Sequence, residues 1–367
     1  MFNFVDQQYM AEALRLAQMG LFSTSPNPRV GCVLVRDQRI VGTGWHQKAG
    51  EAHAEILALR AAGANARGAT AYVTLEPCSH HGRTPPCVEA LIEAGVAQVI
   101  AAMQDPNPRV AGSGFARLRA AGVQVDSGLM QDEAQELNIG FIARMTHGRP
   151  WMRMKIAASL DGRTALANGQ SKWITGAEAR RDGHAWRARA CAVLTGIGTV
   201  SNDDPRLDVR EVDTPRQPLK VLVDSRLQLP PTARLLAGGK LLIAAAVEDK
   251  AAISALIDKG AEVLLLPNEE GKVELTALMR ELARREINEV HVEAGYKLNG
   301  SLLHAGLVDE LLVYLAPCML GDGARGMFNL PELADLGDRR LVQFTEVQTL
   351  GCDLRLRARV VNEAVCQ

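Results

Sequence analysis

The chain has 367 residues, which is longer than one ordinary domain, so we expect two domains. Its 41 basic and 42 acidic side chains nearly balance, which excludes the strongly basic surface that gathers nucleic acid. The longest apolar run, 241–247, is far shorter than the roughly 20 residues that span a bilayer, and the N-terminus does not resemble a secretory signal. Composition therefore favours a cytoplasmic protein that acts on small molecules, with no nucleic-acid partner and no membrane partner.

The first part of the chain alternates short apolar runs with helix-like stretches, which is typical of an α/β domain. These segments are 30–35, 53–62, 71–75, 87–94 and 96–102. An amphipathic stretch over 132–145 predicts a closing helix, and residues that end helices follow it at 146–150. We place the boundary there, with one domain at 1–147 and the other at 148–367.

The second domain shows another α/β alternation, and no internal repeat relates it to the first. Its apolar runs are 151–158, 219–223, 241–247, 262–266 and 289–293, followed by two strand-like stretches at 310–315 and 353–361. We therefore expect two α/β domains with different folds.

The cysteines are odd in number, seven in all, and are spread thinly, which is not typical of a disulfide framework. Cys32 and Cys191 lie in apolar runs, where a reduced cysteine behaves as a small core residue. Only Cys78 and Cys87 have neighbours that indicate chemistry.

One imidazole and two thiols occur in an order that suits zinc, at His53, Cys78 and Cys87. Three protein ligands leave a fourth position open, which is typical of a catalytic zinc that activates water. Glu55 is the candidate proton carrier, because hydrolysis of an amine needs a group that moves protons.

His53 and Glu55 are two residues apart, and in the middle of a helix such residues point to nearly opposite faces. Both can face one site only where a helix begins. We therefore expect His53 to open a helix. Two prolines before Cys87 likewise predict a helix that begins there, where free backbone N–H groups stabilise a thiolate.

The spacing of the cysteines differs from the general deaminase signature, in which His-x-Glu accompanies Pro-Cys-x-x-Cys. Here eight residues separate Cys78 from Cys87. A structural zinc site, with His80 or His81 as its fourth ligand, is the alternative that this spacing leaves open.

The loop over 76–87 resembles the deaminase half of the bifunctional deaminase/reductases of riboflavin biosynthesis, whose zinc loop has this long spacing. The resemblance continues through 26–31, His46 and 104–108. It implies a cytidine-deaminase-like α/β/α fold and a phosphorylated pyrimidine substrate, 2,5-diamino-6-(5-phosphoribosylamino)pyrimidin-4(3H)-one, with water replacing the amine at carbon 2. It places Asn27, His46, His80 and Arg83 against this substrate, and an arginine suits a phosphate.

The second domain has no Gly-x-Gly-x-x-Gly after its first strand, which argues against an ordinary Rossmann dinucleotide site. The segment 292–295 leads through Gly300 and Ser301 into a helix-like stretch at 302–305, whose N–H groups are candidates to receive a phosphate.

This domain resembles the reductase half of the same family, a dihydrofolate-reductase-like domain that uses NADPH, through 159–163, 171–175, 202–207, 223–225 and 293–295. The resemblance places one set of residues against the cofactor: Ala157, Trp173, Thr199, Asp203, Ser225, Gly295, Gly300 and Ser301. It places another set against the substrate: Ser171, Arg187, Leu207, Arg210 and Glu293. Lys155 and Glu293 are the candidates for moving protons, and Arg226 for the 2′-phosphate of the cofactor.

The sequence thus predicts an enzyme that performs zinc-dependent hydrolytic deamination and then NADPH-dependent reduction of a ribosyl group to ribityl. The family resemblance also implies a homo-oligomer, a dimer or a tetramer. A cytidine- or tRNA-adenosine-type deaminase with an unrelated second domain is the alternative enzyme. A structural zinc domain joined to a ligand sensor is the non-enzymatic one.

Overall fold

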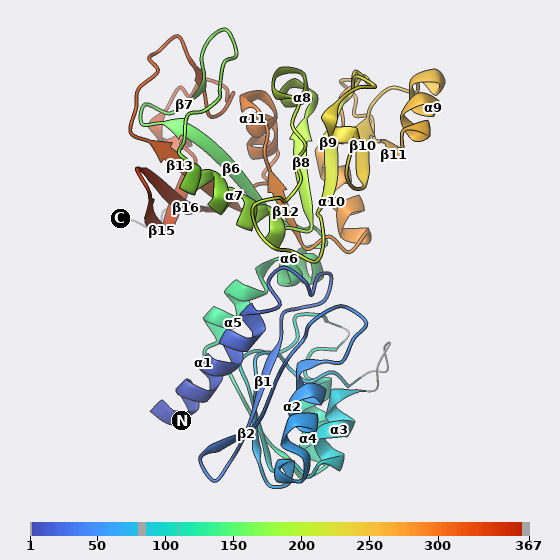
Figure 1. Cartoon of the computed structure of the whole chain (residues 1–367), viewed down its shortest axis with the longest axis vertical. Coiled ribbons are helices and arrows are strands. Elements are labelled where there is room, and N and C mark those ends of the chain that lie inside the picture. Colours follow the sequence, from blue (N-terminus) through green and yellow to red (C-terminus); the bar gives the residue numbers. More distant parts are fainter. Residues whose placement is uncertain (1, 80–85, 109, 362–367) are drawn as a thin grey trace. The chain divides into compact units, whose positions relative to one another are not determined.

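The computed structural model describes residues 2–79, 86–108 and 110–361. The chain divides into two compact units, Met1–Arg149 and Pro150–Gln367 (Figure 1). Among the described residues, no helix is long and apolar enough to cross a membrane.

The first unit is built on a mixed sheet with strand order β2-β1-β3-β4-β5. Its strands are β1 (Gly31–Arg36), β2 (Arg39–Trp45), β3 (Thr70–Val73), β4 (Gln98–Ala101) and β5 (Gln124–Ser127). β1 is antiparallel to both β2 and β3, whereas β3, β4 and β5 are parallel to one another. The carboxyl ends of β3 and β4 therefore lie at the same edge, beside the loops that follow them.

Helices cover both faces of this sheet, as Figure 1 shows. They are α1 (Phe4–Gln18), α2 (Ala54–Ala62), α3 (Cys87–Glu93), α4 (Ser113–Ala120), α5 (Gln131–Leu137) and α6 (Ile139–His147), with a short 3-10 turn at Gly63–Ala66. One core cluster contains Ala58 of α2, Leu91 of α3 and Leu118 of α4. Another contains Ala13 of α1 and Ala134 of α5. The α/β/α fold expected for the first domain is thereby confirmed.

Glycines let α2 approach the sheet closely. A Cβ at Gly42 would lie 2.3 Å from the Ala58 carbonyl oxygen, and one at Gly44 would lie 2.3 Å from that of Ala54. Real Cβ atoms do not come this close, so both positions of β2 require glycine. This contact fixes the amino end of α2, where His53 and Glu55 lie.

The single closing helix predicted over 132–145 is wrong, because two helices meet at Asn138. The Asn138 backbone leaves the helical region at φ −109° and ψ 18°. Its side chain accepts the N–H of Arg29 at 2.8 Å and donates to the Arg29 carbonyl at 2.9 Å. A short polar side chain that bonds to another segment's backbone competes with helix continuation.

The second unit is built on a larger sheet with strand order β11-β10-β9-β8-β12-β6-β13-β16-β15. Neighbours from β11 to β13 are parallel, whereas β16 and β15 are antiparallel additions. The strands are β6 (Trp151–Ser159), β8 (Ala192–Gly196), β9 (Leu219–Val223), β10 (Leu241–Ala245), β11 (Ala261–Leu265), β12 (Glu289–Val292), β13 (Glu310–Ala316), β15 (Leu341–Leu350) and β16 (Asp353–Val361), with β7 (Arg163–Ala165) and β14 (Arg325–Gly326) as a separate ribbon.

The helices of this unit connect the parallel strands. They are α7 (Ala177–Arg189), α8 (Ile197–Asp203), α9 (Lys250–Asp258), α10 (Leu275–Arg284) and α11 (Tyr296–His304), with 3-10 turns at Arg234–Leu236 and Leu336–Asp338. Because the central strands are parallel, the loops after β8, β9 and β12 leave the sheet at one edge, where α/β proteins bind ligands.

Candidate functional site

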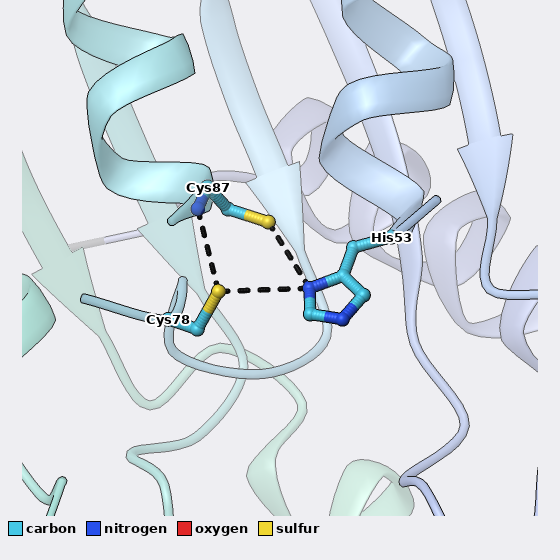
Figure 2. Close-up of side chains that lie close together, drawn as sticks. All are labelled: His53, Cys78 and Cys87. Atoms are coloured by element: carbon cyan, nitrogen blue, oxygen red, sulfur yellow. Dashed lines mark hydrogen bonds between the residues drawn. The ribbon is translucent and has the colours of Figure 1, made fainter. Parts of the chain in front are cut away.

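The three predicted zinc ligands of the first unit lie together (Figure 2). His53 is the N-cap of α2, and Cys87 is the first residue of α3, so both predicted helix starts are confirmed. The Nδ1 atom of His53 lies 3.3 Å from Cys87 Sγ and 3.5 Å from Cys78 Sγ. Tetrahedral zinc with Zn–N near 2.1 Å and Zn–S near 2.3 Å separates such atoms by about 3.6 Å. The donor set therefore fits zinc.

A backbone hydrogen bond prepares the sulfur atom of Cys78 for a metal. The backbone N–H of Cys87 donates to Cys78 Sγ at 3.3 Å, at the amino end of α3. Hydrogen bonding with Cys87 lowers the pKa of the Cys78 thiol, against the opposing effect of burial. Thiolate character is thus favoured at Cys78, and thiolates are the form that binds zinc.

Glu55 lies in the first turn of α2 and is only 4% exposed. Burial, and next the negative charge of Cys78, raise the pKa of Glu55 to about 7. A carboxyl group with this pKa can both take up and release a proton near neutral pH. The site thus combines a zinc-type donor set with a proton-transfer group.

Two further predicted residues, Asn27 and His46, lie beside the donor set. The Asn27 Nδ2 atom is 3.0 Å from His46 Nε2, and His46 Nδ1 is 3.1 Å from the Ala52 carbonyl oxygen. These contacts are satisfied together when Nδ1 carries the proton. Burial lowers the pKa of His46, which favours this neutral form. The ring centroids of His46 and His53 are 5.1 Å apart. His80 and Arg83 lie outside the described residues.

The second unit contains a cavity of about 1630 Å³, larger than the roughly 300–1,000 Å³ of an ordinary small-molecule pocket. It has room for a dinucleotide and a second ligand. The carboxyl ends of β8, β9 and β12 open into it, through Gly196, Ser225 and Glu293. The predicted cofactor and substrate residues that line it are Lys155, Ala157, Ser171, Trp173, Arg187, Thr199, Asp203, Leu207, Arg210, Ser225, Arg226, Glu293, Gly295 and Ser301.

Gly300 is the exception among the predicted cofactor residues. It is buried within α11, and a Cβ there would lie 2.1 Å from the Asn329 carbonyl oxygen, so it packs against protein backbone. The prediction that the helix begins after Ser301 is also wrong. Gly295 is the N-cap, and α11 begins at Tyr296. The helix N–H groups that face the cavity therefore come earlier than expected.

Arg187 and Glu293 form a partly buried ion pair on the wall of the cavity. Arg187 donates through Nε to Glu293 Oε1 and through Nη2 to Oε2, the latter at 2.8 Å. Its Nη1 donates to the Asp208 carbonyl at 3.0 Å. Burial alone would raise the pKa of Glu293, but the charge and hydrogen bonds of Arg187 hold it well below its usual range. Glu293 is therefore an ionised acceptor.

Lys155 lies on β6 and faces the same wall. Burial lowers its pKa, an effect that Glu293 opposes and Arg187 reinforces. Its Nζ atom lies 5.8 Å from the ring centroid of Tyr314. A lysine with a lowered pKa gives up its proton more readily, which suits a proton donor.

Another part of the cavity lining carries polar groups around Asp203. Ser171 donates to Asp203 Oδ1 at 3.2 Å, and Lys172 donates to the Asp203 carbonyl at 2.9 Å. Trp173 is 69% exposed, and the guanidinium of Arg180 lies 4.7 Å from its ring centroid. An exposed tryptophan at a cavity rim offers a flat apolar face to a ligand ring.

Family matches follow the division into two units. The family described as the cytidine and deoxycytidylate deaminase zinc-binding region matches residues 4–103, and the RibD C-terminal domain matches residues 150–356. Together with the sites, these matches define the class: a zinc-dependent deaminase joined to a reductase domain.

Similar proteins cover nearly the whole chain. The riboflavin biosynthesis protein RibD of Escherichia coli is 51% identical over 364 residues, which is 96% of this chain and 98% of that protein. RibD from Acinetobacter baumannii (form 1) has a solved structure with a TM-score of 0.91 and 44% identity, and the match covers 98% of this chain and 99% of that one. A deaminase/reductase structure from Thermotoga maritima has a TM-score of 0.87 and 32% identity, and the match covers 97% of this chain and 99% of that one.

The chain therefore belongs to the RibD family and is a bifunctional enzyme that joins a zinc-dependent deaminase to an NADPH-dependent reductase. These matches disfavour a cytidine- or tRNA-adenosine-type deaminase with an unrelated second domain. They also disfavour a structural zinc domain joined to a ligand sensor.

Proposed function

We propose that the first unit deaminates 2,5-diamino-6-(5-phosphoribosylamino)pyrimidin-4(3H)-one to 5-amino-6-(5-phosphoribosylamino)uracil. The second unit then reduces the ribosyl group of that product to ribityl. The Thermotoga maritima structure is described as a diaminohydroxyphosphoribosylaminopyrimidine deaminase and 5-amino-6-(5-phosphoribosylamino)uracil reductase, which supports both substrates. The observation that carries the proposal is the zinc-type donor set beside a buried Glu55, in the same chain as the large cavity.

In the deaminase, His53, Cys78 and Cys87 hold the zinc, which when bound activates water for attack. Glu55 takes a proton from the attacking water and passes it to the departing amine, a role that its pKa near 7 supports. Asn27 and His46 contact the pyrimidine, since they lie beside the ligand set. His80 and Arg83 complete the substrate contacts, with Arg83 for the phosphate.

In the reductase, NADPH supplies the hydride, and the protein binds, orients and moves protons. Lys155 donates the proton to the ribose oxygen, because its pKa is lowered while Glu293 remains ionised. Glu293 orients the substrate. All three guanidinium nitrogen atoms of its partner Arg187 already donate to Glu293 or to the Asp208 carbonyl. Arg187 therefore contacts the substrate, but Arg210 provides the main phosphate contact. The side chain of Arg210 is half exposed and bonds to Asp208 at 2.7 Å.

The remaining cavity residues bind the other parts of the two ligands. Ser171 and Leu207 contact the substrate, and Arg226 binds the 2′-phosphate of NADPH. The cofactor contacts are Ala157, Trp173, Thr199, Asp203, Ser225, Gly295 and Ser301, all of which line the cavity. Gly300 has a packing role instead.

The chain also forms a homo-oligomer, a dimer or a tetramer. β15 is one of the two outer strands of the large sheet, and its Phe344 and Val347 are 63% and 62% exposed. An outer strand with large exposed apolar side chains is prone to pair with another chain. A cytoplasmic location fits the chemistry, because thiolate zinc ligands require a compartment that keeps cysteines reduced.

The deciding experiment incubates the zinc-loaded protein with the diaminopyrimidinone phosphate, with and without NADPH. Without NADPH we expect ammonia release alone. With NADPH we expect ammonia release followed by loss of the NADPH absorbance. Ammonia release from cytidine but not from this substrate would overturn the substrate assignment, and no NADPH oxidation with the deaminated product would overturn the second step.

A further inference from the structure

Glu76 is a buried carboxylate next to the zinc loop, two residues before Cys78, and it is 3% exposed. Its oxygens accept four backbone N–H groups. Oε2 accepts those of Asp105 at 3.1 Å and Gly112 at 2.9 Å, and Oε1 accepts those of Gly114 at 2.8 Å and Phe115 at 3.3 Å. All four donors lie in another segment, 105–115, which leads from β4 into α4.

Three of these donors belong to the amino end of α4, where backbone N–H groups lack partners within the helix. A carboxylate satisfies them and also interacts favourably with the helix dipole. α4 lies very close to the backbone of Pro77, because a Cβ at Gly114 would lie 2.2 Å from the Pro77 carbonyl oxygen. Glycine is therefore required there for α4 to contact the residue before Cys78.

Further hydrogen bonds carry this anchoring to both cysteines. Glu76 donates its own N–H to the Met103 carbonyl at 2.9 Å, and the Oγ atoms of Ser79 and Ser113 lie 2.7 Å apart. Residues on both sides of Cys78 are thus attached to the neighbouring segment. The Cys78 carbonyl in turn accepts the N–H of Val88, the second residue of α3, at 3.2 Å.

We propose that Glu76 is a positioning residue of the deaminase. Its carboxylate joins the segment that carries Cys78 to the segment 105–115, and this sets the place of Cys78 Sγ relative to His53 and Cys87. The inference rests on the proposed zinc site. It differs from a purely structural role, which would lower the stability of the unit without changing how the folded site holds its metal.

The test compares zinc release to a chelator in the full-length wild type and in Glu76→Gln. The amide NH₂ of glutamine would face two backbone N–H groups, so two buried donors lose their acceptor. We expect zinc release to accelerate by about tenfold or more. We also expect a changed visible spectrum in the cobalt-substituted protein. Reductase activity of the same sample, measured on the second unit, should be unchanged and shows that the preparation is sound.

Glu89→Gln is the matched control. Glu89 of α3 pairs with Arg117 of α4 at 2.6 Å, and both side chains are partly exposed. This change also removes a charged contact to α4, but exposed ion pairs contribute little. We expect zinc release and the cobalt spectrum to match those of the wild type.

Gly114→Ala tests the same contact from the other side. It keeps every donor to Glu76 but forces Pro77 to move, so zinc release should again accelerate. If Glu76→Gln does not fold, the result for Gly114→Ala decides. Wild-type release and spectrum in a folded Glu76→Gln, or in Gly114→Ala, would overturn the role of Glu76. A wild type that binds no zinc would instead overturn the proposed zinc site.

Discussion

Two glutamates, one in each unit, show how their surroundings move carboxyl pKa values in opposite directions. Glu55 has no arginine partner among the residues that the structure describes, and burial together with the negative charge of Cys78 raises its pKa to about 7. Glu293 is partly buried, and Arg187 holds its pKa well below the usual range. Environments that drive carboxyl pKa values apart assign different roles to them. Glu55 is suited to move protons, whereas Glu293 is suited to hold a partner in place.

The first prediction concerns Glu55→Gln. The amide cannot carry the proton, so ammonia release should fall by about 10²- to 10⁴-fold, while zinc content and NADPH oxidation with the deaminated product stay unchanged. Metal analysis and the two activity assays check this. Glu51→Gln, an exposed neighbour, is the control and should behave as the wild type. Deamination retained in Glu55→Gln would remove Glu55 from the proton path.

The second prediction concerns the pair formed by Arg187 and Glu293. Arg187→Met leaves the partly buried Glu293 charge without its partner, so the second unit should lose about 3 kcal/mol of its free energy of unfolding. Adding Glu293→Gln removes that charge and should recover part of the lost stability. Both variants should lack reductase activity, because each removes a proposed substrate contact. Denaturant unfolding of the single and double variants measures both effects. A single variant as stable as the wild type would contradict the prediction.

Site residues differ in how visible they are in the sequence. His53, Glu55, Cys78 and Cys87 are predictable because their chemistry depends on residue type and short spacing. Contacts such as the one between Arg187 and Glu293, 106 residues apart, depend on the fold and have no local pattern. The contacts of Glu76 are harder still to predict, because all its donors are backbone groups of another segment.

Elements were predictable where an apolar run has clear ends. The predicted stretches 219–223 and 353–361 coincide with β9 and β16. Among the elements that were not expected are β2 and β15, many of whose residues are exposed, and the helices α1 and α4. The helix break at Asn138 depends on a hydrogen bond to Arg29, which sequence periodicity does not contain.

The third prediction concerns β15, one of the two outer strands of the large sheet. Phe344→Asp places a charge on its exposed apolar face and should reduce the mass of the particle in solution, measured by light scattering, because a buried unpaired charge disfavours association. Ile257→Asp is the matched control, since Ile257 is 54% exposed on α9, which packs on the strand at the other end of the sheet. An unchanged mass in Phe344→Asp would exclude β15 as the contact surface.

The fourth prediction concerns pH and the strands β6, β13 and β16. Glu310 of β13 is fully buried and bonds to Arg153 Nε at 3.0 Å and to Arg357 Nε at 2.7 Å. Burial alone would raise the pKa of Glu310, but these two arginines lower it from 4.5 to about 2. Because the folded value is the lower one, this carboxylate stabilises the fold above pH 4.5. That contribution, about 3 kcal/mol, disappears as the pH falls towards 2.

Denaturant unfolding of the second unit at several pH values measures this loss. Glu310→Gln should be less stable than the wild type at neutral pH, because it leaves the arginines without their charge partner. It should also show a flatter decline of the free energy of unfolding with acid. If the free energy of unfolding falls with acid as steeply in Glu310→Gln as in the wild type, other groups cause the decline.

At the scale of the whole molecule, each unit has its own hydrophobic core and its own site. One set of core clusters lies within the first unit and another within the second. The zinc-type ligands all belong to the first unit, and the large cavity belongs to the second. Metal binding should therefore stabilise one unit without contributing to the other, because a ligand stabilises only the fold that binds it.

Removal of zinc is the fifth prediction. In a calorimetric scan, chelation should lower the unfolding temperature of the first unit by about 5 °C or more and leave the second transition in place. The zinc-free protein should release no ammonia but should still oxidise NADPH with the deaminated product, and zinc added back should restore ammonia release. Loss of both activities in a protein whose second transition is unchanged would mean that the reductase depends on the metal. That result would contradict the separation of the two sites.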